Sequence, residues 1–417
     1  MKQRYLDLSD DPFIYDKAIM DCFKQKWNRS DVLAYVEKFS GIDRESIYLD
    51  EDGSVRLEAI NGCSKALQEM IDNILKEDFD AIDIVPPRVR QRPDGMTGKM
   101  RDIALLCIPH QLIEHVTFNL LKPLFKAKLF DTQHASIPGR GQTGLKKQIA
   151  KYLRSDLPIT YYCKTDMRHA YASVQYSVVI KELRKDIPSA THIFKLLEYL
   201  GALAPGGHLI IGGYLDAWLF NYMMSKVLAH IYTLGQTRRG KFTRYIVRAV
   251  TYMDDMALFS SSIKGLKIAL KSAEKFAAEE LGMELKISTG IVKLLSIEEE
   301  RARGKVCPFV DMAGYRVYRS RITMRRRVYI RARRQFIRAW KEYQETKTIN
   351  IQRAYKLISY NGFLKQSDSY RFREKYHTDK LVAIARKVIS VHSRIENRKN
   401  KEKKNDLKRR RIEREAV

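Results

Sequence analysis

Apolar residues recur at helical intervals at both ends of the chain and follow a mixed pattern between them. The intervals in residues 13–27 and 57–75 predict that the first 80 residues are helical. Residues from 319 onward have the same spacing, and a charged tail begins at about residue 394. We therefore expect a helical extension before the central region and a helical unit after it.

The central region alternates between strand-like and helix-like segments. Runs of β-branched and aromatic residues at 159–163 and 245–251 are typical of strands. Helical spacing occupies residues 178–184, 214–228 and 263–280. Because the connecting turns are too short for repeated crossovers, we predict an α+β unit with a mainly antiparallel sheet.

The segment between the helical extension and this unit is rich in turn signals and cations. Pro86, Pro87 and the Pro-Asp-Gly sequence at 93–95 separate short basic strands, and a helix is predicted over residues 111–125. The whole chain is long enough for several such units to pack as one protein. The boundaries that these patterns predict are 1–80, 81–158, 159–318, 319–393 and 394–417.

The charge balance indicates a polyanionic partner. Lys and Arg number 77 against 49 Asp and Glu, which leaves a formal net charge of +28. This excess favours nucleic acid as the partner, with an anionic membrane surface as the alternative. No membrane-spanning segment is expected, because Asp216 and two glycines interrupt the most apolar stretch, residues 208–224.

The cysteines and the first residues favour a cytoplasmic location. The five cysteines are scattered singly without zinc-like spacing, so we predict reduced thiols. Residues 1–11 include acidic residues where a signal peptide would have its apolar core. We therefore expect a cytoplasmic protein.

A pair of adjacent acidic residues is the strongest chemical signal in the chain. Residues 244–260 read RYIVRAVTYMDDMALFS, in which two apolar runs flank Asp254 and Asp255. This pattern predicts a hairpin with both carboxylates at its tip. Such carboxylates repel each other and lose hydration, and a divalent cation removes that cost. A solvated acidic turn is the alternative.

A third carboxylate, that of Asp166, ends an apolar strand in residues 160–174, which read TYYCKTDMRHAYASV. If this strand lies beside the hairpin in one sheet, Asp166 faces Asp254, and the three carboxylates can hold two Mg²⁺ ions about 4 Å apart. Such a site suits in-line phosphoryl transfer, because one metal activates a primer 3′-hydroxyl and the other neutralises the leaving pyrophosphate.

These two segments resemble motifs A and C of reverse transcriptases, the second as the YMDD form of their Tyr-x-Asp-Asp signature. Further segments match other motifs of the family in the same order. They are Lys99-Met100-Arg101 (fingers strand), 206–221 (motif B), 281–288 with Lys293 (motif D) and 310–319 (primer grip). The match covers about residues 85–320, and six ordered motifs are far more specific than any one of them.

The resemblance implies a right-hand polymerase fold of the α+β class. Residues 81–158 would form the fingers, 159–318 an antiparallel-sheet palm and 319–393 a helical thumb, after the helical extension and before a basic tail. The metal site would comprise Asp166, Met167, Asp254 and Asp255, with two Mg²⁺ ions that Mn²⁺ can replace. A motif D lysine is thought to protonate pyrophosphate in this family, and Lys286 is the residue that we assign to this role.

The resemblance also implies a set of nucleotide-binding residues. Lys99, Arg101 and Arg168 would contact the incoming triphosphate. Tyr171, five positions after the motif A aspartate, would exclude the 2′-hydroxyl of a ribonucleotide, and a tyrosine of the palm core is the alternative.

In motif B, Gly212 and Gly213 would let the backbone approach the nascent base pair, where a side chain has no room. Asp216 and Ala217 stand where the family commonly has a Ser-Gln pair. We interpret Asp216 as a partner for a cation or an arginine.

Residues 319–338 hold nine arginines and no acidic residue, interleaved with Tyr329 and Phe336. Arginine pairs with phosphates and aromatic rings stack on bases, so this segment is interpreted as a thumb helix along a duplex, with a solvated helix face as the alternative. The residues expected to bind nucleic acid are Gly314, Tyr315, Arg325, Arg326, Arg327, Arg331 and Arg334.

The segment ASIPGRG at 135–141 and the short thumb resemble bacterial, often prophage-linked, enzymes, among them the "unknown group" and defence-associated reverse transcriptases. We predict an RNA-directed DNA polymerase that copies a cognate non-coding RNA into DNA with deoxynucleoside triphosphates, in antiphage defence. No membrane partner is expected, and homo-oligomerisation is left open. The alternatives are the reverse transcriptase of a diversity-generating retroelement and a catalytically idle RNA-binding scaffold of the same fold.

Overall fold

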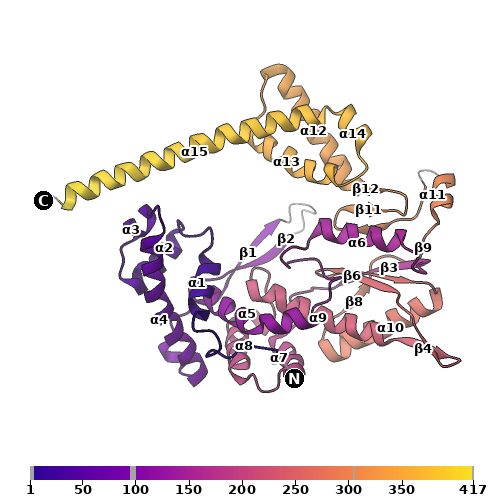
Figure 1. The fold of residues 1–417 in the computed structure, drawn as a ribbon, viewed down its shortest axis with the longest axis horizontal. Helices are drawn as coiled ribbons and strands as arrows, with labels where there is room; N and C mark the ends of the chain where they lie inside the picture. The colour runs from indigo at the N-terminus through magenta and orange to yellow at the C-terminus, as the bar shows by residue number, and fades with distance from the viewer. Residues whose placement is uncertain (1–3, 94–99, 304–305, 416–417) are drawn as a thin grey trace.

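The computed structural model describes residues 4–93, 100–303 and 306–415. Figure 1 shows a group of helices from the N-terminal part at one end, a sheet with its covering helices at the other, and the C-terminal helices above the sheet. Within the described ranges, none of the helices has the length and apolar character needed to cross a membrane.

The central sheet is antiparallel, and β3 (Tyr161–Met167) lies in its middle. On one side β3 pairs with β7 (Asp255–Ser260), which pairs in turn with β6 (Arg248–Tyr252). On its other side β3 pairs with β8 (Leu285–Ile287) and β9 (Val292–Lys293). The predicted α+β class with an antiparallel sheet is confirmed.

Strand periodicity gives this sheet two different faces. Side chains alternate between faces along a strand, so Cys163 packs in the core with the helices below the sheet while Tyr162 packs in a second core. The first core includes α7 (Tyr176–Asp186), α8 (Thr191–Leu203), α9 (Tyr214–Thr233) and α10 (Ile263–Leu281). The second includes α6 (Gln142–Arg154).

The N-terminal helices share the first core through α5 (Ile108–Lys128). Helix α1 packs on α4 and α5, and α2 packs on α4. A mostly exposed two-stranded ribbon, β1 and β2, follows them. The bounds of these elements are α1 (Ile14–Phe23), α2 (Ser30–Ser40), α3 (Arg44–Leu49), α4 (Ser54–Lys76), β1 (Arg88–Pro93) and β2 (Met100–Leu105).

The C-terminal part begins with a small antiparallel sheet and continues as helices with a core of their own. The sequence pattern predicts a helix from residue 319, whereas residues 322–324 form a strand and the helix begins at Arg326. The reason is pairing, because Ile322 lies opposite Val317 in the small sheet. The elements are β10 (Val310–Met312), β11 (Tyr315–Val317), β12 (Ile322–Met324), α12 (Arg326–Thr346), α13 (Ile351–Lys365), α14 (Tyr370–Lys375) and α15 (Thr378–Glu415).

Short connecting elements complete the described chain. They are η1 (Phe79–Ala81), η2 (Pro205–Gly207), the hairpin of β4 (Gly235–Arg238) and β5 (Lys241–Arg244), and α11 (Ile297–Arg303).

Candidate active site

The adjacent aspartates lie at a tight turn of the central sheet. Strands β6 and β7 are joined by Met253 and Asp254, and Tyr252 pairs with Asp255 across the turn. Met253 has a φ of 53°, the left-handed conformation that such two-residue hairpins use. The predicted hairpin is therefore present, with Asp254 in the turn and Asp255 as the first residue of β7.

Strand pairing brings Asp166 to the same place. Thr165 lies opposite Met256, so the end of β3 lies beside the start of β7. The carboxyl groups of Asp166 and Asp254 are close enough for a hydrogen bond. The structure therefore brings together three carboxylates from segments about 90 residues apart in the sequence, as the pattern predicts.

Burial and the nearby negative charges raise the pKa of two of these carboxyl groups, those of Asp254 and Asp255. Burial, followed by the charges of Asp255 and Asp166, raises the pKa of Asp254 to about 6. Burial also raises the pKa of Asp255, and the nearby Lys164 opposes that rise. Lys164 Nζ lies 2.6 Å from Asp255 Oδ1, and its side chain is only 13% exposed.

Lys164 is a site residue that the sequence analysis missed. It precedes Asp166 by two positions in β3, so both side chains project from the same face of the strand. Strand periodicity would have identified it as a neighbour of the aspartates. Its ammonium group is a positive charge supplied by the chain itself to the carboxylate cluster.

The donor set fits a hard divalent cation in its chemistry, because carboxylate oxygens are the ligands that Mg²⁺ prefers. In the described ranges no three or more His, Cys, Asp or Glu side chains are placed so that together they could hold a metal ion. Asp255 is instead directed at Lys164. The Met167 side chain is buried in the core, so only its main chain is available to a metal.

Tyr171 lies close enough to Asp254 for the charge of that carboxylate to act on its hydroxyl group. Its ring stacks on Phe220 of α9, with centroids 5.2 Å apart and an angle of 19° between planes. Burial, then the charges of Asp216 and Asp254, raise the pKa of its hydroxyl. The ring is partly exposed, so its position is compatible with nucleotide contact, which stays a prediction.

The predicted triphosphate cations lie in different surroundings. Arg101 is exposed on β2. Arg168 follows β3 and forms an ion pair with Glu284 at 2.8 Å. Lys286 is exposed on β8, where it pairs with Asp166 across the sheet. Lys99 lies outside the described residues.

The two glycines of motif B are required by packing within the protein, and their approach to a nascent base pair stays a prediction. A Cβ on Gly212 would lie 2.5 Å from the Ala104 carbonyl oxygen of β2, and its φ of +126° also favours glycine. A Cβ on Gly213 would overlap the carboxylates of Asp216 and Glu114. The glycines thus let this loop pack against the fingers ribbon and a buried acidic pair.

Asp216 and Glu114 form this buried pair, and the interpretation of Asp216 as a partner for a cation or arginine is wrong. Tyr176 donates its hydroxyl to Asp216 Oδ1 at 2.7 Å, and the Tyr214 main-chain N–H donates to Glu114 Oε2 at 2.9 Å. The other oxygen of each carboxylate is buried near Gly213 without a hydrogen-bond donor.

Burial raises the pKa of Asp216 to about 7 against the hydrogen bond from Tyr176, which lowers it. Burial and then the charge of Asp216 raise the pKa of Glu114 well above its ordinary range. We conclude that the pair retains a proton at neutral pH.

Replacing Asp216 with Asn tests this shared proton. A raised folded-state pKa means that the stability contributed by the proton is complete below pH 3.8 and is lost as the pH rises through about 7. Asn keeps an amide proton at every pH. We therefore expect the stability of Asp216→Asn to depend less on pH, so that between pH 5.5 and 8.5 the variant gains about 2 kcal/mol relative to the wild type. A variant destabilised equally at both pH values would contradict the shared proton, and Asp156→Asn, an exposed site, is the control.

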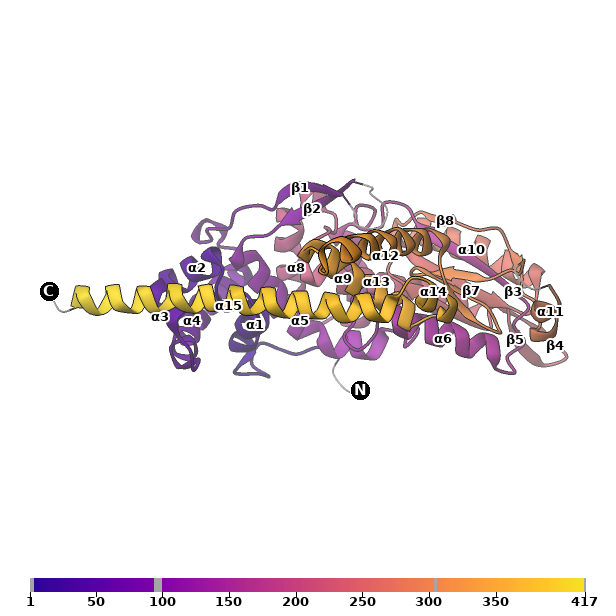
Figure 2. The ribbon, with the colours of Figure 1, turned by 90° about the horizontal axis from the view of Figure 1, so that it is seen from above.

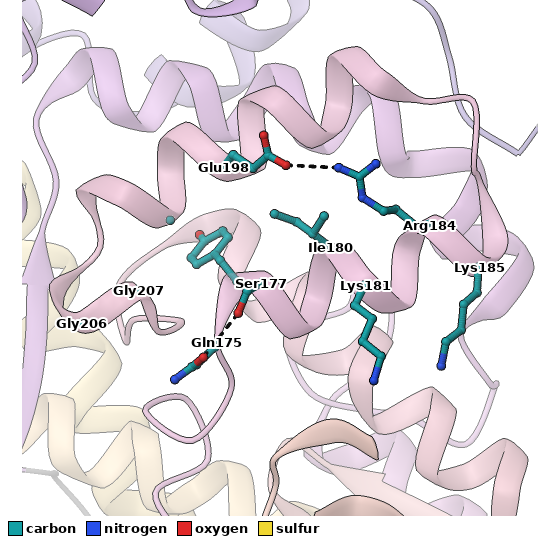
Figure 3. Close-up of a pocket in the computed structure, with 11 residues that line it drawn as sticks. Gln175, Ser177, Ile180, Lys181, Arg184, Lys185, Glu198, Gly206 and Gly207 are labelled. Carbon is teal, nitrogen blue, oxygen red and sulfur yellow. Dashed lines mark hydrogen bonds and ion pairs between the residues drawn. The ribbon is translucent and has the colours of Figure 1, made fainter. Parts of the chain in front are cut away.

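A separate hollow of about 800 Å³ lies between α7 and α8. Figure 3 shows Lys181 and Lys185 extending from α7, and the ion pair between Arg184 and Glu198 at 3.2 Å along its rim. None of the predicted site residues lines it. Its one link to the site is Tyr176, which contributes to its wall and binds Asp216.

The predicted primer grip is a tight hairpin between β10 and β11. Its turn residues, Ala313 and Gly314, both have positive φ, as a type I′ turn requires. The Tyr315 ring is buried against Phe363 at 5.2 Å, with Lys146 Nζ 5.0 Å from its centroid. The Tyr315 ring thus fills the junction between the small sheet and α13, and a contact of this hairpin with nucleic acid stays a prediction.

The arginines of α12 separate into two groups. Arg325, just before the helix, pairs with Asp311 at 2.5 Å. Val328, Ala332, Phe336 and Ala339 form the buried face, and the remaining faces carry the other arginines, with Arg326 exposed. Helical spacing aligns four of these arginines in one stripe: Arg327, Arg331, Arg334 and Arg338. All of them except Arg338 are among the residues that the sequence predicts to bind nucleic acid.

Comparison with known proteins agrees with this geometry. Residues 89–290 match the family model described as reverse transcriptase (RNA-dependent DNA polymerase). Residues 89–290 therefore match a reverse transcriptase domain, and the right-hand polymerase fold of that domain is the one that the sequence predicts. No curated protein sequence matches the chain.

Solved structures similar to the chain include structures of telomerase. Apo telomerase from Candida tropicalis, truncated from its C-terminal domain, is 10% identical, with a TM-score of 0.39, over 63% of this chain and 60% of that one. Telomerase from Candida albicans with a fragment of telomeric RNA is 10% identical, with a TM-score of 0.40, over 89% and 76%. The chain thus spans less than two thirds of the first, and similarity this low does not by itself support a shared function.

Proposed function

We propose that the protein is an active RNA-directed DNA polymerase that uses Asp166, Asp254 and Asp255 for two-metal nucleotidyl transfer. The observation that carries this proposal is the meeting of three carboxylates at one end of β3 and β7, inside a reverse transcriptase domain. Three clustered carboxylates, of which Asp254 and Asp255 have a raised pKa, are costly to keep unless they act on a cation.

Two Mg²⁺ ions, or Mn²⁺ in their place, would supply activation of the primer hydroxyl and charge neutralisation at the leaving pyrophosphate. Asp166, Asp254 and Asp255 would hold them, with the Met167 main chain nearby. Lys164 orients Asp255 and balances its charge before the cations arrive. The cross-strand position of Lys286 beside Asp166 supports a role as the proton donor to the leaving group.

The substrates follow from the reverse transcriptase domain. We propose RNA as the template, deoxynucleoside triphosphates as substrates and DNA as the product. Arg101 and Arg168 would contact the triphosphate, with Arg168 exchanging its pairing with Glu284 for phosphate. The biological setting that we propose is antiphage defence with a cognate non-coding RNA in the cytoplasm, which rests on the ASIPGRG segment and is tested by sequencing the RNA that co-purifies.

The arginine stripe of α12 gives a prediction about nucleic-acid binding. Each phosphate contact adds about 0.9 to the slope of log affinity against log salt concentration. Replacing Arg334 and Arg338 with Ala should therefore reduce that slope by about 2. The matched control removes the exposed Lys267 and Lys271 from α10, on the far side of the palm from α12 (Figure 1). An equal change in both variants would contradict a specific thumb contact.

The proposal is tested by extension of a DNA primer annealed to RNA. We expect Mg²⁺-dependent synthesis that a chelator stops and that Mn²⁺ restores. Binding of RNA without synthesis, under any divalent cation, would favour the idle scaffold instead.

A further inference from the structure

The C-terminal helix α15 is anchored in the thumb at its beginning. Leu381, Val382 and Ala385 are buried in the thumb core with Phe336 and Leu357. From this anchor the helix runs back over the molecule toward the N-terminal helices, as both views in Figures 1 and 2 show. It therefore joins the last unit of the chain to the first.

The far end of α15 docks on α3 through one face. Along residues 404–411 the partly covered positions are 404, 407, 408 and 411, which is the spacing of a single helix face. The contacts are Lys404 Nζ 5.0 Å from the Tyr48 ring centroid, Lys408 Nζ to Glu51 Oε1 at 2.9 Å, Arg411 Nη1 to Ser46 Oγ at 2.5 Å, and Arg414 Nη1 to Glu45 Oε2 at 3.7 Å.

Between the two anchors the helix has no protein cover. Every residue from 390 to 403 is exposed, on all faces of the helix, including the face toward the palm and fingers. At 1.5 Å per residue this span is about 21 Å long. It carries five basic and two acidic side chains. A polar helix of this kind is typical of a bridge between domains.

We propose that α15 closes the space between thumb and N-terminal helices into a ring around the primer–template duplex, with the α15–α3 contact as its latch. The inference rests on the proposed polymerase function. The exposed basic span, residues 390–403, faces the phosphates of the duplex. The α15–α3 contact opens to admit the duplex and then closes, so that the duplex is retained during synthesis.

The chemistry of the latch suits opening. Its ion pairs are exposed, with Lys408 and Glu51 at 44% and 70%, and exposed pairs are individually weak and screened by salt. Apolar cover at this contact is small and comes from the partly covered Leu407, the Tyr48 ring and the Lys404 stem. The contact of α15 with the thumb core is apolar, and it persists while the α15–α3 contact breaks and re-forms.

Charge reversal tests the latch in the full-length protein. The variants are Glu51→Lys, Lys408→Glu and both together, and Arg409→Glu is the control because Arg409 lies off the docking face with the same charge change. Dissociation of a prebound labelled RNA–DNA duplex is measured after excess unlabelled duplex is added, and product length is measured under the same trap. Single-nucleotide addition by the prebound complex is measured in parallel.

Each single reversal should speed duplex release and shorten products by roughly threefold, the double variant should recover toward the wild type, and single-nucleotide addition should stay unchanged. Unchanged release and product length in both single variants, or equal loss with Arg409→Glu, would overturn the ring. Wild-type protein that binds the duplex without extending it would refute the polymerase proposal, while the release rates would still decide the ring.

Discussion

Replacing Asp254 with Asn should reduce DNA synthesis by about a thousandfold or more while leaving nucleic-acid binding in place. Asp254 lies in the turn, in hydrogen-bonding range of Asp166 and next to Asp255. An amide is a poor ligand for a hard cation, and stabilisation of the developing charge by metal is worth several kcal/mol in the transition state. The expected change is in the rate of the chemical step, measured by single-turnover addition to a prebound primer–template.

The same variant should be more stable than the wild type when no divalent cation is present. The folded-state pKa of Asp254 is raised to about 6, so its stabilising proton is lost as the pH rises through that value, and the ionised form weakens the fold at pH 7.5. Asn carries no charge and avoids this cost. A melting temperature above that of the wild type without metal, together with lost synthesis, would separate catalysis from folding. The control is Asp156→Asn, an exposed aspartate before the opposite end of β3.

Replacing Tyr171 with Val should raise the use of ribonucleotides relative to deoxynucleotides by roughly a hundredfold, the range that a steric pocket provides. The Tyr171 ring is held by Phe220 at 5.2 Å and lies near Asp254. If the sugar of the incoming nucleotide packs on this ring, the ring would leave no volume for a 2′-hydroxyl. The measurement is the ratio of incorporation efficiencies for the two nucleotides opposite the same template base.

Tyr171→Phe is the matched control, because it keeps the ring and removes only the hydroxyl. We expect it to discriminate as the wild type does. If Tyr171→Val instead lowers the melting temperature and leaves the ratio unchanged, Tyr171 is a core residue of the palm and has no part in selection.

The strands and helices of the palm could be predicted from local patterns, because strand and helix periodicity depends only on residues that are close together in the sequence. Asp254 and Asp255 between two apolar runs predict their own hairpin, and Asp166 at the end of a strand predicts its place beside them. The family resemblance added the order of the motifs. These are features that a short window of sequence contains.

Contacts between distant residues could not be predicted in the same way. Asp216 pairs with Glu114, from a helix 102 residues earlier, so nothing near Asp216 in the sequence indicates a shared proton. The buried position of Tyr315 depends on Phe363 of α13. The position of Lys164 beside the aspartates, in contrast, could have been predicted, because its two-residue spacing from Asp166 places both side chains on one face of β3.

The docking of α15 on α3 is another contact of this kind. The tail sequence is charged and mainly basic, which fits a free helix or an RNA-binding arm equally well. Its partner residues, on α3 and just after it, lie more than 350 residues earlier, as the pair of Lys408 and Glu51 shows. Only the folded chain reveals which face of the tail is covered.

Template-directed addition on RNA tests the central claim most directly. Four reactions contain wild-type protein, Mg²⁺, one deoxynucleotide each and a DNA primer on an RNA template, and they are repeated on templates that differ only in the first unpaired base. We predict that the primer is extended only by the complementary deoxynucleotide and that the preferred nucleotide changes with the template base. Extension that ignores the template base, or no extension on RNA with any divalent cation, would contradict the assignment of this protein as an RNA-directed DNA polymerase.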